Sequence, residues 1–169
     1  MWFATADGLS RYDGTSFTNF RHDRDNSDSL SNNNTFSLIE SGDGLIWVGT
    51  DPGGLNVYNP ETGKFTVYLH DPDDPNSLPD DSIWSLLEDR DGDIWVGTRG
   101  GLSRLDRESG LFANYLPDAE NPRSLAAPVV YRIYQDSAST IWVGGNSGLQ
   151  RYNPETDDFT TFVQDDKDM

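Results

Sequence analysis

The sequence predicts an all-β protein, a β-propeller fragment of about four blades, each a four-stranded antiparallel sheet. Gly-Leu pairs recur at 8–9, 54–55, 101–102 and 148–149, and the tryptophans Trp2, Trp47, Trp95 and Trp142 keep almost the same period. Each period contains four short runs rich in aromatic and β-branched residues, and no run of ten residues has helical periodicity. A repeat of this length with four strands is typical of a propeller blade.

The second repeat shows the expected strands most clearly. They are "TFSLIE" at 35–40, "IWVGT" at 46–50, "LNVYN" at 55–59 and "FTVYL" at 65–69. Successive side chains of a strand point to opposite faces, and neither face of "IWVGT" is polar. We therefore expect this sheet to be covered on both faces.

The turns between these runs agree with antiparallel hairpins. "NPETGK" has Asn before a Pro that suits the second turn position, and it supplies Gly63 for a left-handed residue. The short "GDG" at 42–44 and "DGD" at 91–93 fit tight hairpin connections.

Three segments resemble a known repeat family: "IWVGT…GL…YNPETGKFTVY" at 46–68, "DPDDPNSL" at 71–78 and "SLLEDRDGDIWVGTRGGL" at 85–102. The chain is similar over nearly its whole length to the two-component regulator propeller repeats. These occur in extracytoplasmic sensor regions of hybrid histidine kinases and some diguanylate cyclases. The last repeat departs from the family pattern with "DSAST" at 136–140, and the first has "WFAT" in place of "WVGT".

The family's strand order, from inner to outer, defines the blades. It implies a partial first blade at 2–20 that lacks its inner strand, and three complete blades at 35–69, 82–116 and 129–163. The loop that follows the outer strand, "DPDDPNSL" in the second repeat, stops after "DDKDM" in the last. We therefore expect part of a larger propeller, with seven blades if the family is a guide. Its two open apolar faces would meet the remaining blades or a second copy of the chain.

The charge is strongly acidic: 12 Lys and Arg against 29 Asp and Glu give a net charge of −17. Such a surface repels phosphate backbones and anionic lipid, so we expect no nucleic-acid partner and no direct membrane contact. It attracts cations and basic or neutral polar ligands. The simpler interpretation is that the acids occupy exposed turns and keep the protein soluble.

Several kinds of site and segment are not expected. Cysteine is absent, which excludes disulfides, thiolate metal sites and a cysteine nucleophile. No apolar run approaches the ~18 residues of a membrane span, and the N-terminus lacks the features of a signal peptide. The acid-rich stretches 71–76 and 89–93 lack the EF-hand pattern, so turn formation explains them and calcium binding stays open. His22 and His70 occupy equivalent positions on the outer rim and should not share a metal, and no cofactor is expected.

One face of the propeller should carry variable residues. The turns between second and third strands differ just before each Gly-Leu pair, where matched positions hold Asp7, Asp51, Arg99 and Asn146. Divergence at matched positions of a repeat indicates a surface freed from building the scaffold, and binding residues are often carried on such loops.

The inner strands add a second set of candidates. Phe36, Trp84 and Tyr131 share one matched position and are followed by Ser37, Ser85 and Arg132. Aromatic rings beside a channel suit stacking on sugars, but large side chains more often fill the wedge between blades. Arg99 and Arg132 could bind a carboxylate or sulfate group, or pair with one of the many acids.

Our leading functional hypothesis is a non-catalytic, ligand-binding sensory segment of a two-component-type receptor. The resemblance implies a periplasmic location and a small polar ligand such as an oligosaccharide. An alternative is a propeller enzyme such as a polysaccharide or lactone lyase, which would need an acid and a base near the axis. A purely structural interaction platform is the third possibility. No set of nucleophile, base and orienting residue can be assembled, so no catalytic or metal-binding residue is assigned.

Overall fold

The computed structural model describes residues 1–162, which form 15 strands in four antiparallel sheets. Blade 1 contains β1 (Trp2–Thr5), β2 (Gly8–Tyr12) and β3 (Phe17–Phe20). Blade 2 contains β4 (Thr35–Glu40), β5 (Ile46–Thr50), β6 (Leu55–Asn59) and β7 (Lys64–Tyr68). Blade 3 contains β8 (Ile83–Glu88), β9 (Ile94–Thr98), β10 (Leu102–Asp106) and β11 (Leu111–Tyr115). Blade 4 contains β12 (Val130–Gln135), β13 (Ile141–Gly145), β14 (Gly148–Asn153) and β15 (Asp158–Phe162).

The all-β prediction is confirmed, and so is a first blade of three strands beside three blades of four. The outer strand of blade 2 begins one residue before the expected 65–69, because Lys64 already pairs with Asn59 across the turn. Residue 163 of the expected last blade and the predicted loop fragment at 165–169 lie outside the described residues. Residues 1–162 contain no helix long and apolar enough to cross a membrane.

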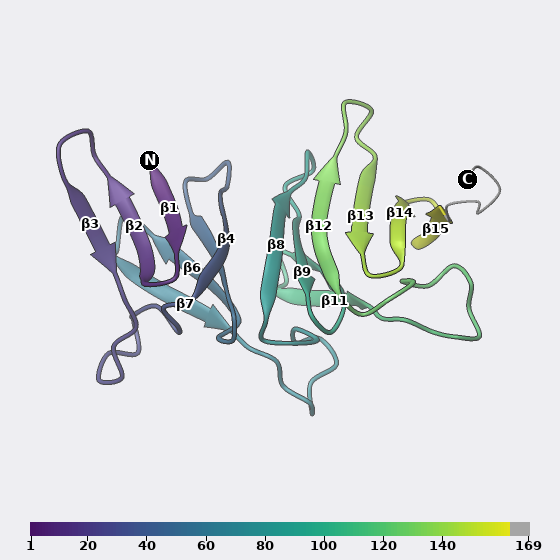
Figure 1. The fold of residues 1–169 in the computed structure, drawn as a ribbon, viewed down its shortest axis with the longest axis horizontal. Helices are drawn as coiled ribbons and strands as arrows, with labels where there is room; N and C mark the ends of the chain where they lie inside the picture. The colour runs from purple at the N-terminus through teal and green to yellow at the C-terminus, as the bar shows by residue number, and fades with distance from the viewer. Residues whose placement is uncertain (163–169) are drawn as a thin grey trace, which may run out of the picture.

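The four sheets follow one another in chain order, like the blades of a fan (Figure 1). Within each complete blade the strands are paired in sequence, so β4, β8 and β12 are inner strands and β7, β11 and β15 are outer ones. The inner strands are neighbours: β4 contacts both β1 and β8, and β8 contacts β12. Consecutive blades therefore meet face to face from the inner strand outward.

The hydrophobic core lies between blades rather than inside any one of them. It divides into three clusters, each formed by two consecutive blades and the loop joining them. In the cluster between blades 3 and 4, Trp95 and Leu102 of blade 3 pack against Ile141, Val143 and Phe159 of blade 4. Because a β-sheet exposes side chains on both faces, blades 2 and 3 each contribute to two clusters, whereas blades 1 and 4 each contribute to one of the three.

The repeated tryptophan, on the second strand of each complete blade, makes the same hydrogen bond within its own blade. Trp95 is 1% exposed, and its indole Nε1 donates to Oδ2 of Asp89 at 2.7 Å. Trp47 and Trp142 donate in the same way to the residue six positions earlier, Oγ of Ser41 and Oδ2 of Asp136, each at 2.9 Å. The rings of Trp47 and Trp95 fill the space between blades, and in all three tryptophans the one polar atom is satisfied by the hairpin turn of the same blade.

The long loops between blades are structural caps, as their constant length predicts. Each buries the leucine of its Ser-Leu pair, and Leu30 and Leu78 are both 0% exposed. Each loop also accepts a backbone hydrogen bond from the outer strand of the next blade, as when the Phe65 amide donates to the Asp28 carbonyl at 3.0 Å.

Matched glycines allow the blades to approach closely. A Cβ atom at Gly97 would lie 2.7 Å from Cγ1 of Val130, on the inner strand of the next blade. At the matched Gly144 of blade 4, the nearest described atom would be the Arg132 carbonyl oxygen at 3.9 Å. The glycine of "IWVGT" is thus required wherever a following blade packs on it.

This difference predicts unequal effects of the same substitution. Gly97→Ala should destabilise the chain by about 1–3 kcal/mol, because Val130 and its blade must move to admit the methyl group. Gly144→Ala should change the free energy of unfolding by less than about 0.5 kcal/mol. Urea unfolding of both variants measures the difference, and equal effects would contradict the packing described.

Candidate functional site

Each inner strand has a β-bulge at the same place. The pairing with the second strand shifts by one residue between Thr35 and Ser37, between Ile83 and Ser85, and between Val130 and Arg132. The extra residue in the three bulges is Phe36, Trp84 or Tyr131. A bulge breaks the ladder and re-aims a side chain, and bulges are frequent next to functional sites. The three aromatic residues predicted as candidates are therefore the ones turned out of the sheet.

Two of the three bulged rings lie largely at the surface. Phe36 is 54% exposed and Tyr131 is 45% exposed, while Trp84 is half-buried. The rings of Trp84 and Tyr131 stack on each other, with centroids 5.5 Å apart and planes 4° from parallel. Phe36 is thus exposed, whereas Trp84 and Tyr131 also pack against each other across two blades.

The predicted Asp51 joins this stack. The indole Nε1 of Trp84 donates to Oδ2 of Asp51 at 3.3 Å. The backbone of Asp51 is held by Asn34, whose carbonyl accepts from the Asp51 amide at 3.0 Å and whose Nδ2 donates to the Asp51 carbonyl at 2.9 Å. Residues from three consecutive blades thus meet in one patch, and we call Asp51, Trp84 and Tyr131 the aromatic cluster.

The other predicted residues are not gathered there. Asp7 is bound by both Nε and Nη2 of Arg21, at 3.1 and 2.6 Å, and the pKa of this carboxyl is lowered by these hydrogen bonds and by the guanidinium charge. Arg99 lies 3.4 Å from Oδ2 of Asp80, the ion pair anticipated as its alternative role. Asn146 is exposed in the turn between β13 and β14.

Arg132 lies on a different surface of blade 4. Its matched residue Ser85 faces the following blade, where its Oγ accepts from the Ile133 amide at 3.0 Å. Arg132 therefore projects from the face of blade 4 that is open in the described chain, and its Nη1 donates to the Tyr131 carbonyl at 2.8 Å.

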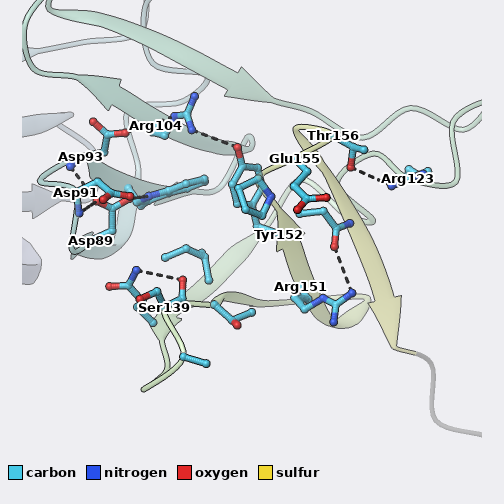
Figure 2. Close-up of a pocket in the computed structure, with 17 residues that line it drawn as sticks. Asp89, Asp91, Asp93, Arg104, Arg123, Ser139, Arg151, Tyr152, Glu155 and Thr156 are labelled. Atoms are coloured by element: carbon cyan, nitrogen blue, oxygen red, sulfur yellow. Dashed lines mark hydrogen bonds and ion pairs between the residues drawn. The ribbon is translucent and has the colours of Figure 1, made fainter.

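A second candidate site lies at the opposite ends of the strands, and the sequence did not predict it. A cavity of about 630 Å³ opens between blades 3 and 4 beside their hairpin turns (Figure 2). We call it the hairpin groove. Its walls are the β8–β9 turn with Asp89, Asp91 and Asp93, and the β14–β15 turn with Pro154 and Glu155.

The floor of the hairpin groove is a network of aromatic and charged groups. The guanidinium of Arg104 lies 5.6 Å from the centroid of Trp95, donates to the Tyr152 hydroxyl at 3.2 Å and lies 3.8 Å from Oδ2 of Asp93. Tyr152 and Tyr115 donate in turn to Oδ1 of Asp157, at 2.6 and 2.7 Å. Burial and the bond to Asp157 raise the pKa of Tyr115, so this hydroxyl stays protonated.

Asp157 has an unusual backbone for this network. Its φ is 52°, whereas the matched residues of the other two complete blades are glycines, with φ of 73° at Gly63 and 74° at Gly110. Burial opposes ionisation of Asp157, but hydrogen bonds from Tyr152 and Tyr115 outweigh it and lower its pKa. Asp157 thus places a carboxylate at a position where the other complete blades have glycine, and this carboxylate accepts hydrogen bonds from two tyrosine hydroxyls.

The carboxylates of the acidic wall repel one another. Burial, together with the nearby charge of Asp89, raises the pKa of Asp93, and Arg104 only partly offsets this. Among residues 1–162, no group of three or more His, Asp or Glu is arranged to hold a metal ion. The groove is bordered by carboxylates and aromatic rings.

Comparison with known proteins places the chain among propellers. Residues 29–51, 77–100 and 124–147 match the family model described as "Two component regulator propeller". The extracellular domain of a protein assigned as a hybrid two component system, from B. thetaiotaomicron, is 27% identical, with a TM-score of 0.67 over 94% of this chain. A virginiamycin B lyase from Staphylococcus aureus is 19% identical, with a TM-score of 0.67, and 98% of this chain aligns to 52% of that one.

The chain spans about a quarter of the extracellular domain that it resembles, 28% of its length. No curated protein sequence matches it. The lyase likeness is below 25% identity and reflects the fold alone.

The raised pKa of Asp93 predicts that replacing this residue increases the thermal stability of the chain, by an amount that depends on pH. Since the pKa of Asp93 in the folded chain lies above its ordinary value of 3.8, its ionisation destabilises the fold at neutral pH, and the penalty disappears as pH falls through the raised pKa. Asp93→Asn should raise Tm by about 1–3 °C at pH 7 and by less near pH 4. The same charge change at exposed Asp73, Asp73→Asn, is the control. A gain that does not shrink on acidification, or an equal gain in the control, would refute this assignment.

Proposed function

We propose that the chain, three segments of which match the two component regulator propeller model, is a non-catalytic, ligand-binding sensory segment of a two-component-type receptor. The observation that supports a ligand site most directly is the set of matched bulges. Three inner strands place an aromatic side chain at one bulged position, and two of these rings form a stack hydrogen-bonded to Asp51. A repeat built only for packing has no need of two exposed rings and a half-buried one there.

We propose that the ligand is a small polar molecule such as an oligosaccharide. The ring of Tyr131 is covered by Trp84 on one face only among the described contacts, and a pyranose ring stacks well on such an amphipathic surface. Oδ1 of Asp51 has no hydrogen-bond partner within residues 1–162 and is placed to accept a sugar hydroxyl. In this proposal Phe36, on the neighbouring inner strand, would border the ligand, and Arg99 would reach it only after leaving Asp80.

We further propose that the segment acts outside the cytoplasmic membrane, in the periplasm, with its output domain elsewhere in the receptor. The 27% identity over 94% of the chain to an extracellular domain of a hybrid two-component system supports this location. In this proposal the remaining blades, or a second copy of the chain, meet its open blade faces.

The enzyme alternative has less support from the residues at the aromatic cluster. Both histidines serve the caps instead, because Nδ1 of His22 and of His70 hydrogen-bonds to the carbonyls of Leu30 and Leu78, at 2.8 and 2.6 Å. A general base would have to come from Asp51, for which no acid partner lies in the cluster. The similarity to lyases supports a shared fold and no more.

Calorimetric titration of the chain with a panel of oligosaccharides tests the sensory proposal. We expect one glycan class to bind, with Trp84→Ala and Tyr131→Ala each weakening the affinity about tenfold or more. Tyr134→Ala is the matched control, since Tyr134 lies on the same strand, is 63% exposed and is outside the cluster. Arg99→Ala reports whether that residue leaves Asp80 to bind the ligand.

Unchanged affinity in both cluster variants would remove the cluster from the site. No binding by any glycan, together with capture of a protein domain by the same face, would favour the interaction-platform alternative.

A further inference from the structure

Blades 2 and 3 form a second groove at the position that matches the hairpin groove, and an arginine of the chain itself fills it. We call it the sister groove; it is bordered by Trp47, Leu105 and Arg107, and its cavity is about 230 Å³. Arg107, from the β10–β11 turn of blade 3, reaches back toward blade 2. Its guanidinium lies 5.6 Å from the centroid of Trp47, bonds to Oδ2 of Asp43 and donates to Oε1 of Glu88 at 3.4 Å.

The hairpin groove lies between matched turns but lacks that arginine, and Arg104 of blade 3, which replaces Val57 of blade 2, holds the position over its tryptophan. The β14–β15 turn has Pro154 where the β10–β11 turn has Arg107, and the β8–β9 turn has Asp91 where blade 2 has Asp43. Proline has no side chain that can reach across, and the cavity is about 630 Å³. Within residues 1–162, the Asp91 carboxylate has no hydrogen-bond or ion-pair partner, although its counterpart Asp43 is bonded to a guanidinium.

The cations nearest to the hairpin groove have other partners. Arg123 is bound to Asp158 at 2.6 Å and to Thr156 at 3.0 Å, and Arg151 donates to Oδ1 of Asn153 at 3.3 Å. Arg104 remains on Trp95 and Tyr152 at the floor. Figure 2 shows Asp91 and Asp93 on the blade 3 wall and Glu155 on the blade 4 wall, facing the same cavity. Glu155 likewise has no side-chain partner among the described residues.

We propose that the hairpin groove binds an external guanidinium group, or the alkylammonium group that presents the same charge. The ligand's cation would pair with Asp91, as Arg107 pairs with Asp43 in the sister groove, and would be bordered by Asp93 and Glu155. A charge-assisted bidentate bond between guanidinium and carboxylate supplies both affinity and orientation. Arg104 keeps its position over Trp95, so the ligand stacks beside it rather than replacing it. This site is separate from the aromatic cluster, at the other end of the strands.

Residue-resolved NMR titration of the chain with N-acetyl-argininamide tests this proposal. We expect saturable one-to-one binding, with backbone amide shifts concentrated at residues 89–93 and 153–156. The neutral isostere N-acetyl-citrullinamide should bind at least about tenfold more weakly, because it cannot form the charge-assisted bonds. N-acetyl-lysinamide distinguishes the two cation types, and binding only of the lysine compound would restrict the proposal to ammonium groups.

Two substitutions exchange the features of the two grooves. Pro154→Arg gives the hairpin groove its own guanidinium, and binding should fall at least tenfold; Arg fits this turn because the matched turn already contains Arg107. Arg107→Ala empties the sister groove, so a second equivalent of ligand should bind, with new shifts at residues 41–45. If Arg107→Ala weakens folding, the loss of binding in Pro154→Arg alone tests the proposal.

Asp73→Asn is the control for charge, since it changes the net charge by the same amount as Pro154→Arg but lies on the outer rim. It should leave the affinity unchanged. Undiminished binding to Pro154→Arg, equal binding of the citrulline compound, or shifts spread over all the acidic loops would overturn the proposal. Trp84→Ala should not alter this binding, so failure here and failure of the glycan site are distinguishable.

Discussion

Packing of one blade against the next is the interaction on which the whole structure depends. A blade presents apolar side chains on both faces, and each of the three core clusters is closed only by two consecutive blades. The tryptophan in the second strand is central to this contact, because its ring fills the interface and its indole nitrogen is satisfied within its own blade. The glycine two residues later lets the following inner strand approach. These requirements recur in every blade, which is why the same letters recur in the sequence.

Functional features arise where a repeat departs from those requirements at a position that does not affect the interface. The bulge on each inner strand adds one residue without disturbing the ladder beyond it, so an aromatic ring can be exposed at little cost to the core. The β14–β15 turn has Asp157 where the other complete blades have glycine, and the β10–β11 turn has Arg107 where blades 2 and 4 both have proline, because turns tolerate exchange. The first departure yields the aromatic cluster and the second yields the hairpin groove, at opposite ends of the strands. The scaffold can therefore support two binding surfaces that vary independently.

Most of the fold could be predicted from the sequence, because blade architecture depends on local patterns. Alternation in "IWVGT", turn residues and a constant period are visible in one chain, and the strands lie within a residue of their expected positions. The aromatic set at Phe36, Trp84 and Tyr131 was also visible, although its exposure was not, because a bulge depends on cross-strand register. The pairing of Asp51 with Trp84 depends on how two blades are placed in space, so residue spacing alone could not predict it.

The hairpin groove was missed for a different reason. Its signal was present as Pro154 opposite Arg107 and Asp157 opposite glycine, but only the contacts of Arg107 with Asp43 and Glu88 show what that arginine does. Charged residues in a turn are ordinarily exposed to solvent and have no binding role. The acids at 89–93 fit that ordinary case in the sequence, and only the structure shows that they border a groove.

Hydrogen exchange of the indole N–H groups of Trp47, Trp95 and Trp142 tests the account most directly. Trp47 and Trp95 are 3% and 1% exposed beneath the following blade, whereas Trp142 is half-buried on the open face of blade 4. If blade-to-blade packing is the source of stability, Trp47 and Trp95 should exchange slowly and at similar rates, and Trp142 markedly faster. Equal protection of all three, or slowest exchange at Trp142, would contradict it, since each blade would then be stable without its neighbour.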